Sequence, residues 1–306
     1  MNVAVYNCEP NYKNLALEKI RIYHQQKGDF VEDYISVADH TYDKIYCSSI
    51  FDESIRETLR YPVKPKKDNR WICGGTGFDL ITKLPPEIDA IKPRLNFGFT
   101  TRGCIRKCPF CVVPEKEGNV HVVGDIYDLW DGKRKNSRNG GEVKLSDNNI
   151  LAMPDHFYKI CDQLKQEKIK VDFNQGLDIR LLTNEMAKTL KTLRHEEYKF
   201  AFDHLEMELL IKKKVDMLQA NGINRSKFYV LVGYDTTFKQ DMQRIKLLRD
   251  LGQNAYVMRY KRDNIYIPLA EWANQPHIFH GMTWEQFLDH PEKQKYKPLF
   301  EMGASL

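Results

Sequence analysis

The sequence predicts an α/β fold in which parallel strands are joined by helices. Short apolar segments rich in strand-forming residues alternate with longer segments of helical periodicity along nearly the whole chain of 306 residues, which is typical of parallel sheets. A proline-containing stretch, Leu84–Pro93, interrupts this alternation. Because the length suits two domains, we expect a small domain over residues 1–88 and a larger one over residues 89–306.

The first domain is expected to be a small doubly wound sheet, similar to that of flavodoxin. A helical pattern over Leu15–Gln26 places apolar residues on one stripe. Each predicted strand runs into polar or turn residues, and ligands of open parallel sheets bind at such carboxyl ends. The predicted strands are Asn2–Asn7, Phe30–Ile35, Lys44–Ile50 and Arg70–Cys73.

The second domain shows six strand–helix units, fewer than the eight of a closed barrel. We expect a partial, TIM-like (β/α)6 barrel that is open on one side. The aromatic segment Trp272–Phe287 follows the last unit and is expected to pack on the core or to cap the open side of the barrel, with stacking on a base as the alternative. The predicted strands are Asn96–Thr100, Val143–Leu145, Lys170–Phe173, Lys199–Phe202, Phe228–Val232 and Ala255–Arg259, and the predicted helices are His156–Glu167, Asn184–Leu193, Met207–Asn221 and Phe238–Leu251.

Composition and charge limit the classes of protein to which this chain can belong. No apolar run approaches the roughly 20 residues that span a bilayer, so we expect no contact with membranes. The chain begins with a strand pattern rather than an export signal, which predicts a cytoplasmic protein. The net charge of +5 is milder than that of a dedicated nucleic-acid binder. The seven cysteines are an odd number, which argues against a disulfide framework.

Three cysteines, Cys104, Cys108 and Cys111, lie close together directly after the first predicted barrel strand. Thiolates are the natural ligands of iron–sulfur clusters. The spacing C-x3-C-x2-C offers three of them, so one iron of a [4Fe–4S] cluster would lack a protein ligand and would be open to a substrate. The alternative is a zinc site with His121 as the fourth ligand, in a nucleic-acid-interacting protein without catalysis.

The motif resembles the signature of the radical S-adenosylmethionine (SAM) superfamily, because Phe110 supplies the aromatic residue that precedes the last cysteine. The resemblance covers about residues 95–259. It implies an oxygen-sensitive [4Fe–4S] cluster and SAM as cofactors, with an electron donor such as flavodoxin or ferredoxin. The implied reaction is reductive cleavage of SAM to methionine and a 5′-deoxyadenosyl radical, followed by hydrogen abstraction from a substrate. RNA or another phosphate-bearing molecule is a candidate substrate.

The same resemblance implies that SAM lies at the carboxyl ends of the later strands. After the second strand, Asp147 and Asn148 are the candidates for binding the ammonium group. After the third, Arg180 would grip the SAM carboxylate through two hydrogen bonds, while Gln175 and Asp178 are candidates for ribose or substrate. A structural salt bridge between Asp178 and Arg180 is the alternative.

The fourth and fifth strand ends complete the expected SAM site. Asp203 is a candidate for the ribose, and the backbone of Val232 and Gly233 is a candidate for the adenine, since glycine allows a close approach. A basic loop over residues 133–138 is expected near the same face, where it would contact phosphate if the substrate carries one.

The first domain resembles two arrangements found ahead of radical SAM barrels. Cobalamin-dependent enzymes bind cobalt through a histidine after the first strand, and no histidine stands there at the required spacing, so we expect a cobalamin-binding-like fold without cobalamin. The tRNA methylthiotransferases use three cysteines at strand ends to hold a second [4Fe–4S] cluster for sulfur insertion. Cys8, Cys47 and Cys73 fall at three predicted strand ends, and their alternative role is that of small buried hydrophobic residues.

Overall fold

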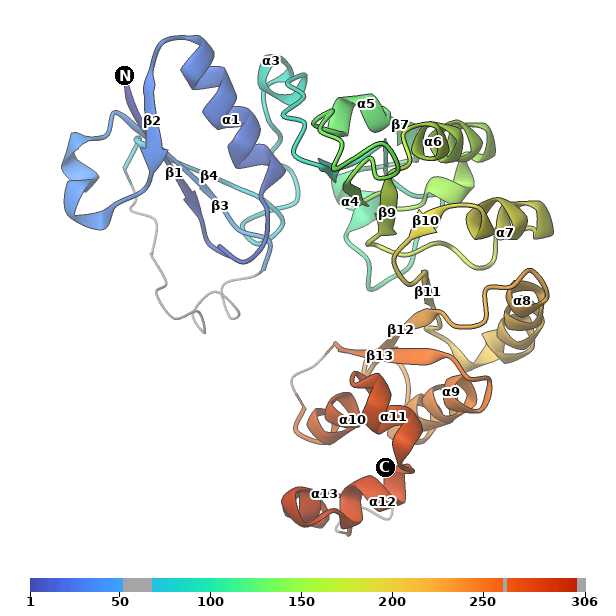
Figure 1. The fold of residues 1–306 in the computed structure, drawn as a ribbon. Helices are drawn as coiled ribbons and strands as arrows, with labels where there is room; N and C mark the ends of the chain where they lie inside the picture. Colours follow the sequence, from blue (N-terminus) through green and yellow to red (C-terminus); the bar gives the residue numbers. More distant parts are fainter. Residues whose placement is uncertain (52–67, 261–262, 302–306) are drawn as a thin grey trace.

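The computed structural model describes residues 1–51, 68–260 and 263–301. Its N-terminal sheet has the strand order β2-β1-β3-β4 (Figure 1). The predicted strands and helix of this part are confirmed to within two residues at each end. The elements are β1 (Asn2–Asn7), α1 (Leu15–Gln26), β2 (Phe30–Asp33), the 3-10 helix η1 (Ser36–Thr41), β3 (Lys44–Ser48), β4 (Trp71–Gly74) and α3 (Pro86–Asp89).

The N-terminal sheet is parallel throughout. β1 pairs with β2 on one side and with β3 on the other, and β4 lies beyond β3. The chain therefore changes direction across the sheet between β1 and β3, which makes their carboxyl ends a topological switch point, where ligands of such sheets bind. Helix α1 buries Leu17 and Ile20, and the side chain of Asn14 caps its N-terminus by accepting the N–H of Leu17.

The second part of the chain contains two further parallel sheets, with the orders β10-β9-β8-β5 and β11-β12-β13, and an antiparallel pair, β6-β7. The strands are β5 (Phe97–Gly98), β6 (Thr101–Arg102), β7 (His121–Val122), β8 (Glu142–Leu145), β9 (Lys170–Phe173), β10 (Arg194–His195), β11 (Lys199–Ala201), β12 (Lys227–Val232) and β13 (Asn254–Arg259). The helices are α4 (Val113–Lys116), α5 (Ile126–Leu129), η2 (Ile150–Ala152), α6 (Pro154–Gln166), α7 (Asn184–Lys191), η3 (Leu205–Met207), α8 (Glu208–Ala220), α9 (Phe238–Asp250), α10 (Tyr266–Ala273), α11 (Pro276–Gly281), α12 (Trp284–Asp289), η4 (Pro291–Tyr296) and α13 (Pro298–Glu301).

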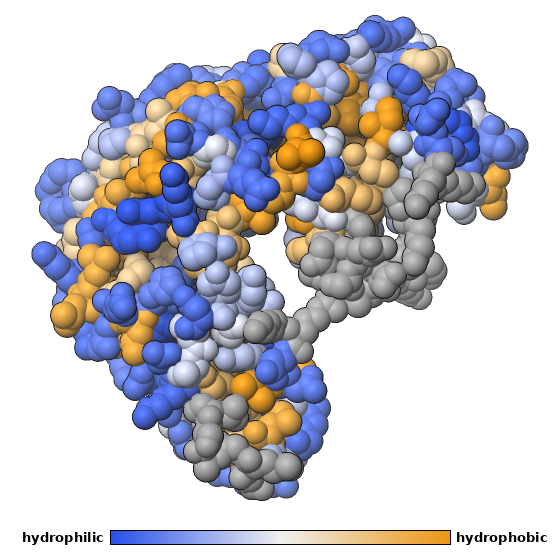
Figure 2. Space-filling view, turned by 180° about the vertical axis from the view of Figure 1, so that it is seen from behind, coloured by the Kyte–Doolittle hydropathy of each residue, from blue (hydrophilic) through white to orange (hydrophobic). Residues whose placement is uncertain are grey.

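The α/β class with parallel sheets is confirmed, since the six strands and four helices expected in this part are all present. An isolated parallel bridge between Leu177 and Phe200 joins the two sheets. Helices α6 to α9 follow one another along the outer side of the strands (Figure 1). In the space-filling view the chain forms an arch, with the N-terminal sheet at one end and the C-terminal helices at the other (Figure 2).

The strands of the second part present one face to the helices and the other to the inside of the arch. In β12, Phe228, Val230 and Val232 are buried, whereas Tyr229 and Leu231 between them are partly exposed. This period of two is that of a strand with one covered face. The helix-covered face therefore forms the core, and the opposite face keeps partial access to solvent.

The C-terminal aromatic segment packs into this core. Trp272, Phe279 and Phe287 are almost fully buried, and Trp272 meets both Phe279 and Trp284 edge to face. The indole N–H of Trp272 donates to the carbonyl of Met282 at 3.1 Å. These rings stabilise the fold, so the alternative that they stack on a base is wrong for this segment.

A buried ion pair ties helix α9 to two strand ends. The side chains of Arg244 and Asp241 are both inaccessible to solvent. Arg244 donates to the backbone carbonyls of Phe202 and Leu231, at 2.6 and 2.7 Å. Asp241 accepts the backbone N–H of Gly233 at 3.2 Å. The pair thereby fixes the carboxyl ends of β11 and β12 relative to each other.

Strand β13 is the edge of its sheet, and one side chain covers part of that edge. The N–H of Val257 donates to Oδ1 of Asn274 at 2.6 Å, and Nδ2 of Asn274 donates to the carbonyl of Val257 at 3.2 Å. The amide of Asn274 thus occupies both backbone groups that a further strand would use at this position.

Candidate functional site

The three clustered cysteines lie on one irregular segment, residues 103–111, which we name the cysteine loop and which follows β6. The N–H of Cys104 donates to the carbonyl of Gly118 at 3.1 Å, and that of Cys111 to the carbonyl of Cys108 at 3.0 Å. All three thiols are partly exposed. Burial raises the pKa of Cys108 and Cys111, and the neighbouring cysteines add to this effect.

Gly103 starts the cysteine loop in a conformation that favours glycine. Its φ is +79°, and a Cβ at this position would lie 2.3 Å from the carbonyl oxygen of Asn119. The N–H of Gly103 donates to Oδ1 of Asn148 at 2.9 Å. Asn148, a predicted SAM ligand, thus uses its carbonyl oxygen to hold the loop.

Asp147, the second candidate at the end of β8, is buried and anchors the preceding strand end. Its Oδ1 accepts hydrogen bonds from the backbone N–H and the hydroxyl of both Thr100 and Thr101. Burial raises the pKa of its carboxyl. Its Oδ2 is buried and has no hydrogen-bond partner among the described residues, so one acceptor remains for a donor from outside the chain.

Asn149 contacts a cysteine directly, and sequence reasoning missed it. Its Nδ2 lies 3.4 Å from Sγ of Cys104 and 3.2 Å from Oδ2 of Asp178. Its Oδ1 is buried and, within the part of the chain that the structure describes, has no partner. The available signal was its position at the end of a predicted strand, directly after two residues already selected for that reason.

Of the residues predicted at the end of β9, Asp178 and Arg180 form ion pairs, whereas Gln175 does not join them. The carboxylate of Asp178 accepts hydrogen bonds from Nε of Arg180 at 2.7 Å and from Nε of Arg106, in the cysteine loop, at 2.9 Å. The expected alternative, a salt bridge between Asp178 and Arg180, is therefore present. Gln175 is exposed at the same strand end.

Arg180 also faces the cysteines. The positive charge of Arg180 lowers the pKa of the Cys108 thiol, against the larger effect of burial. Asp203, at the end of β11, is half-buried, and its Oδ1 accepts a hydrogen bond from the N–H of Leu231 at 3.4 Å. Burial raises the pKa of Asp203, and the charge of Arg180 opposes this rise. Arg180 thus influences the pKa of both Cys108 and Asp203.

Aromatic rings continue the site along the last strand ends. Phe110 of the cysteine loop lies with its ring centre 5.5 Å from that of Tyr234 and 6.4 Å from that of His204. Tyr234 meets Tyr260 edge to face at 4.7 Å. The half-exposed ring of Tyr260 ends this row of aromatic side chains.

The backbone groups expected to bind adenine, at Val232 and Gly233, form hydrogen bonds with other residues of the chain. The side chain of Val232 is buried, and its carbonyl accepts the N–H of Tyr260 at 3.0 Å. Gly233 has a φ of +73°, and a Cβ there would lie 2.7 Å from the ring of Tyr266. The N–H of Gly233 is taken by Asp241. Gly233 therefore allows the close approach of Tyr266, which lies beneath the turn.

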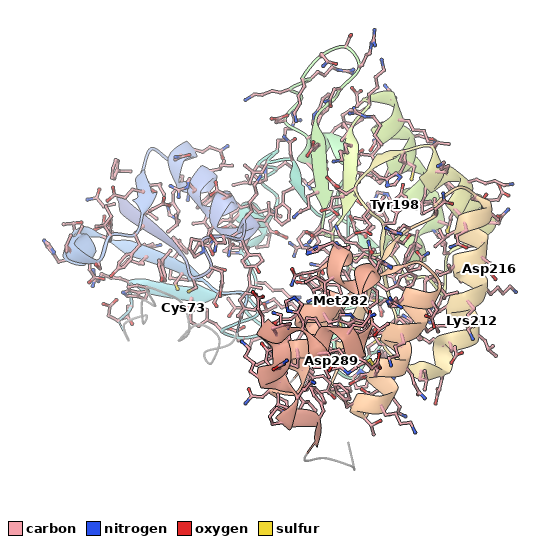
Figure 3. The ribbon with its side chains drawn as sticks, turned by 60° about the horizontal axis from the view of Figure 1, so that its bottom comes forward. Cys73, Tyr198, Lys212, Asp216, Met282 and Asp289 are labelled. Carbon is pink, nitrogen blue, oxygen red and sulfur yellow. The ribbon has the colours of Figure 1, made fainter. Side chains whose placement is uncertain are left out.

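The N-terminal cysteines converge at the switch point of their sheet. Sγ of Cys8 lies 3.6 Å from Sγ of Cys47. Cys47 and Cys73 are directly paired across β3 and β4, and Cys73 lies on this sheet (Figure 3). Hydrogen bonds with Cys73 and Cys8, together with burial, raise the pKa of the Cys47 thiol. The three strand ends thus bring three thiols into contact.

Neither group of thiols has the geometry of a metal site in this structure. Across residues 1–51, 68–260 and 263–301, no three histidine, cysteine, aspartate or glutamate side chains are placed to hold one ion. His121, the fourth ligand of the zinc alternative, is exposed, and its Nδ1 lies 2.9 Å from the carbonyl of Asn119. Metal binding requires deprotonated thiols, and here it also requires a change in their side-chain arrangement.

The basic loop over residues 133–138 lies at the opposite end of the sheet from the cysteines. Nζ of Lys168 donates to the carbonyl of Ser137 at 2.9 Å, and a guanidinium nitrogen of Arg194 donates to the carbonyl of Arg138 at 3.3 Å. Lys168 and Arg194 stand at the amino ends of β9 and β10. The expectation that this loop borders the site was wrong, because it precedes β8 and packs where the strands begin.

Comparison with known proteins gives no family for the chain. No protein-family model matches it, and no curated protein matches it. Among the described residues, the helices are all too short or too polar to cross a bilayer. The functional interpretation therefore depends on the side chains gathered around the cysteine loop.

Proposed function

We propose that the chain is a radical SAM enzyme whose cluster ligands are Cys104, Cys108 and Cys111. The observation that carries the proposal is the position of the C-x3-C-x2-C motif, on a loop that follows the first parallel strand. Asn149, from the next strand end, contacts the thiol of Cys104, and Asp178, from the one after it, binds Arg106 of the loop. When bound, the cluster and SAM supply a 5′-deoxyadenosyl radical that removes hydrogen from a substrate.

The proposed architecture is a partial (β/α)6 barrel formed by β5, β8, β9, β11, β12 and β13. The bridge between Leu177 and Phe200 supports the continuity of the two sheets. In barrel enzymes, functional side chains stand at the carboxyl ends of the strands. The cysteine loop, Asp178, Arg180 and Asp203 all stand at such ends.

The residues around the cysteine loop fit a cluster and a zwitterionic ligand. Three thiols at one loop supply three of the four ligands of a [4Fe–4S] cluster. Nδ2 of Asn149 already lies 3.4 Å from the sulfur of Cys104, and such donors tune clusters. The buried, unpartnered oxygens of Asp147 and Asn149 are acceptors of the kind that an ammonium group requires.

Anaerobic reconstitution with iron and sulfide tests the proposal. About four irons per chain, with 5′-deoxyadenosine formed from SAM and dithionite, is the expected result. Bound zinc without sulfide, and no SAM cleavage, would instead support the zinc-binding alternative. Both elements and the nucleoside are quantified on the same sample, so that a partly loaded protein is not mistaken for an inactive one.

Substitution of Arg180 by alanine is expected to weaken SAM binding by about tenfold or more, since a charge-assisted hydrogen bond is lost. Iron content should remain at the wild-type value, because the three thiols are untouched. Equilibrium binding of SAM to the reconstituted protein measures the effect. Unchanged affinity would mean that Arg180 serves only its salt bridge with Asp178.

A second candidate function, sulfur insertion into RNA with an auxiliary cluster, is favoured by the contact among Cys8, Cys47 and Cys73. Three thiols at a topological switch point occupy the place where such sheets bind ligands. The distance of 3.6 Å between the sulfurs of Cys8 and Cys47 supports this reading. The competing role of these cysteines is core packing, since two of the three are buried.

Replacement of Cys47 by alanine separates the two roles of the N-terminal cysteines. If they hold a cluster, the wild-type protein binds about eight irons and the variant about four. Cleavage of SAM at the cysteine loop should continue in the variant. A wild-type protein with about four irons that Cys47→Ala leaves unchanged would show that these cysteines are packing residues.

A further inference from the structure

Asp178 is a carboxylate that meets three donors at the end of β9. Besides Arg106 and Arg180, Nδ2 of Asn149 lies 3.2 Å from its Oδ2. Its side chain is 6% exposed. Burial alone would raise the pKa of this carboxyl, but the hydrogen bonds from Arg180 and Arg106 outweigh burial and lower the pKa. Asp178 is therefore ionised, and its donors are held by charge-assisted bonds.

Two of the three donors connect Asp178 to the cysteine loop. Asn149 uses the same Nδ2 to contact the sulfur of Cys104 at 3.4 Å. Arg106 is itself a residue of the loop, midway between Cys104 and Cys108. Arg180 binds the carboxylate from the same strand end. A single carboxylate thus links the start and the middle of the segment that contains Cys104 and Cys108.

The cysteine loop needs such a support because it has no regular structure. Backbone N–H groups near its two ends, on Gly103, Cys104 and Cys111, donate hydrogen bonds. Between these points, the bond from Arg106 to Asp178 ties the loop to a strand end. A loop tied only at its ends would sample more conformations, and placing its thiols would cost more entropy.

We propose that Asp178 is a positioning residue that holds the cysteine loop against the end of β9 through Asn149 and Arg106. Its importance for cluster assembly rests on the proposed function, whereas its effect on the loop does not. Arg106 and Arg180 are 32% and 37% exposed, so water can solvate them when the carboxylate is removed. The Asp178→Ala protein is therefore expected to fold.

Hydrogen exchange of the metal-free protein tests this proposal. In Asp178→Ala, amide exchange over residues 103–111 should accelerate by about tenfold, the effect of losing a charge-assisted hydrogen bond. Asp172→Ala is the matched control. Asp172 also lies on β9 and also pairs with two cations, Lys144 and Lys199, but neither belongs to the cysteine loop. Its removal should leave exchange of the loop unchanged.

The conservative variant Asp178→Glu and the iron-loaded protein give two further measurements. Asp178→Glu should restore slow exchange at least in part, and Asp178→Ala should lose iron to a chelator about tenfold faster than the wild type. Unchanged exchange of the loop in Asp178→Ala would overturn the proposal, as would faster exchange spread evenly over the whole fold. Faster exchange confined to the loop, in a chain that binds no iron, would uphold the positioning role and reject the proposed function.

Discussion

Replacement of Cys108 by alanine is expected to abolish iron binding at the cysteine loop and the formation of 5′-deoxyadenosine. The two thiols that remain, Cys104 and Cys111, are too few to hold a [4Fe–4S] cluster of this kind. Cys108 is partly exposed, so its truncation leaves no large cavity and the fold should persist. Iron and sulfide analysis after anaerobic reconstitution, followed by an assay with SAM and dithionite, measures the result.

Cys161→Ala is the matched control for this experiment. Cys161 is a free cysteine of the same part of the chain, but it is fully buried in α6. Its truncation should cost about 1 kcal/mol of stability through lost packing and leave iron content and SAM cleavage intact. A Cys108→Ala protein that still cleaved SAM would refute the assignment of the cluster ligands.

Replacement of Arg244 by methionine is expected to destabilise the fold by about 3–5 kcal/mol, because it leaves the carboxylate of Asp241 buried without its cation. The carbonyls of Phe202 and Leu231 also lose a donor. Urea-induced unfolding followed by circular dichroism measures the change. The loss should appear as a lower denaturation midpoint with a similar slope.

Two further variants give this stability prediction its controls. Lys246→Met removes a cation from the same helix, but from an exposed pair with Glu285, and should cost less than about 0.5 kcal/mol. Adding Asp241→Asn to Arg244→Met removes the uncompensated charge and should recover part of the loss. If Arg244→Met were no more destabilising than Lys246→Met, the buried pair would not stabilise the ends of β11 and β12.

The fold class was predictable because the spacing of apolar residues along a helix or strand depends on which of its faces packs against the core. Strand β12 shows this directly: alternate apolar residues face the helices, and the pattern is visible in the sequence. The antiparallel strands β6 and β7 have two residues each and leave no such pattern. Their pairing depends on the loop that contains the cysteines, so periodicity gave no sign of it.

The candidate site was predictable in residue type and less so in detail. Polar residues at strand ends indicated Asp147, Asp178 and Arg180, and these side chains do lie around the cysteine loop. Some of these side chains keep an oxygen without a hydrogen-bond partner and others do not. The difference depends on hydrogen bonds from residues distant in sequence, such as those from Thr100 and Thr101 to Asp147. Such contacts arise from the tertiary fold and leave no local signal.

The two buried charged residues of α9 are a second example of a feature that the local sequence does not reveal. Asp241 and Arg244 are spaced as a common surface pair along a helix, yet both are fully buried. Their burial follows from the place where α9 crosses the ends of β11 and β12. The convergence of Cys8, Cys47 and Cys73 likewise required the strand order, which makes β1, β3 and β4 neighbours.

The side-chain amide of Asn274 affects the tendency of the protein to self-associate. An edge strand with free backbone groups is a template on which another chain can add a strand and begin to aggregate. At Val257 both groups are already bonded to Asn274, so an incoming strand would have to break two hydrogen bonds before forming any. At Val257 the edge of the last sheet is therefore protected against pairing with a strand of a second copy.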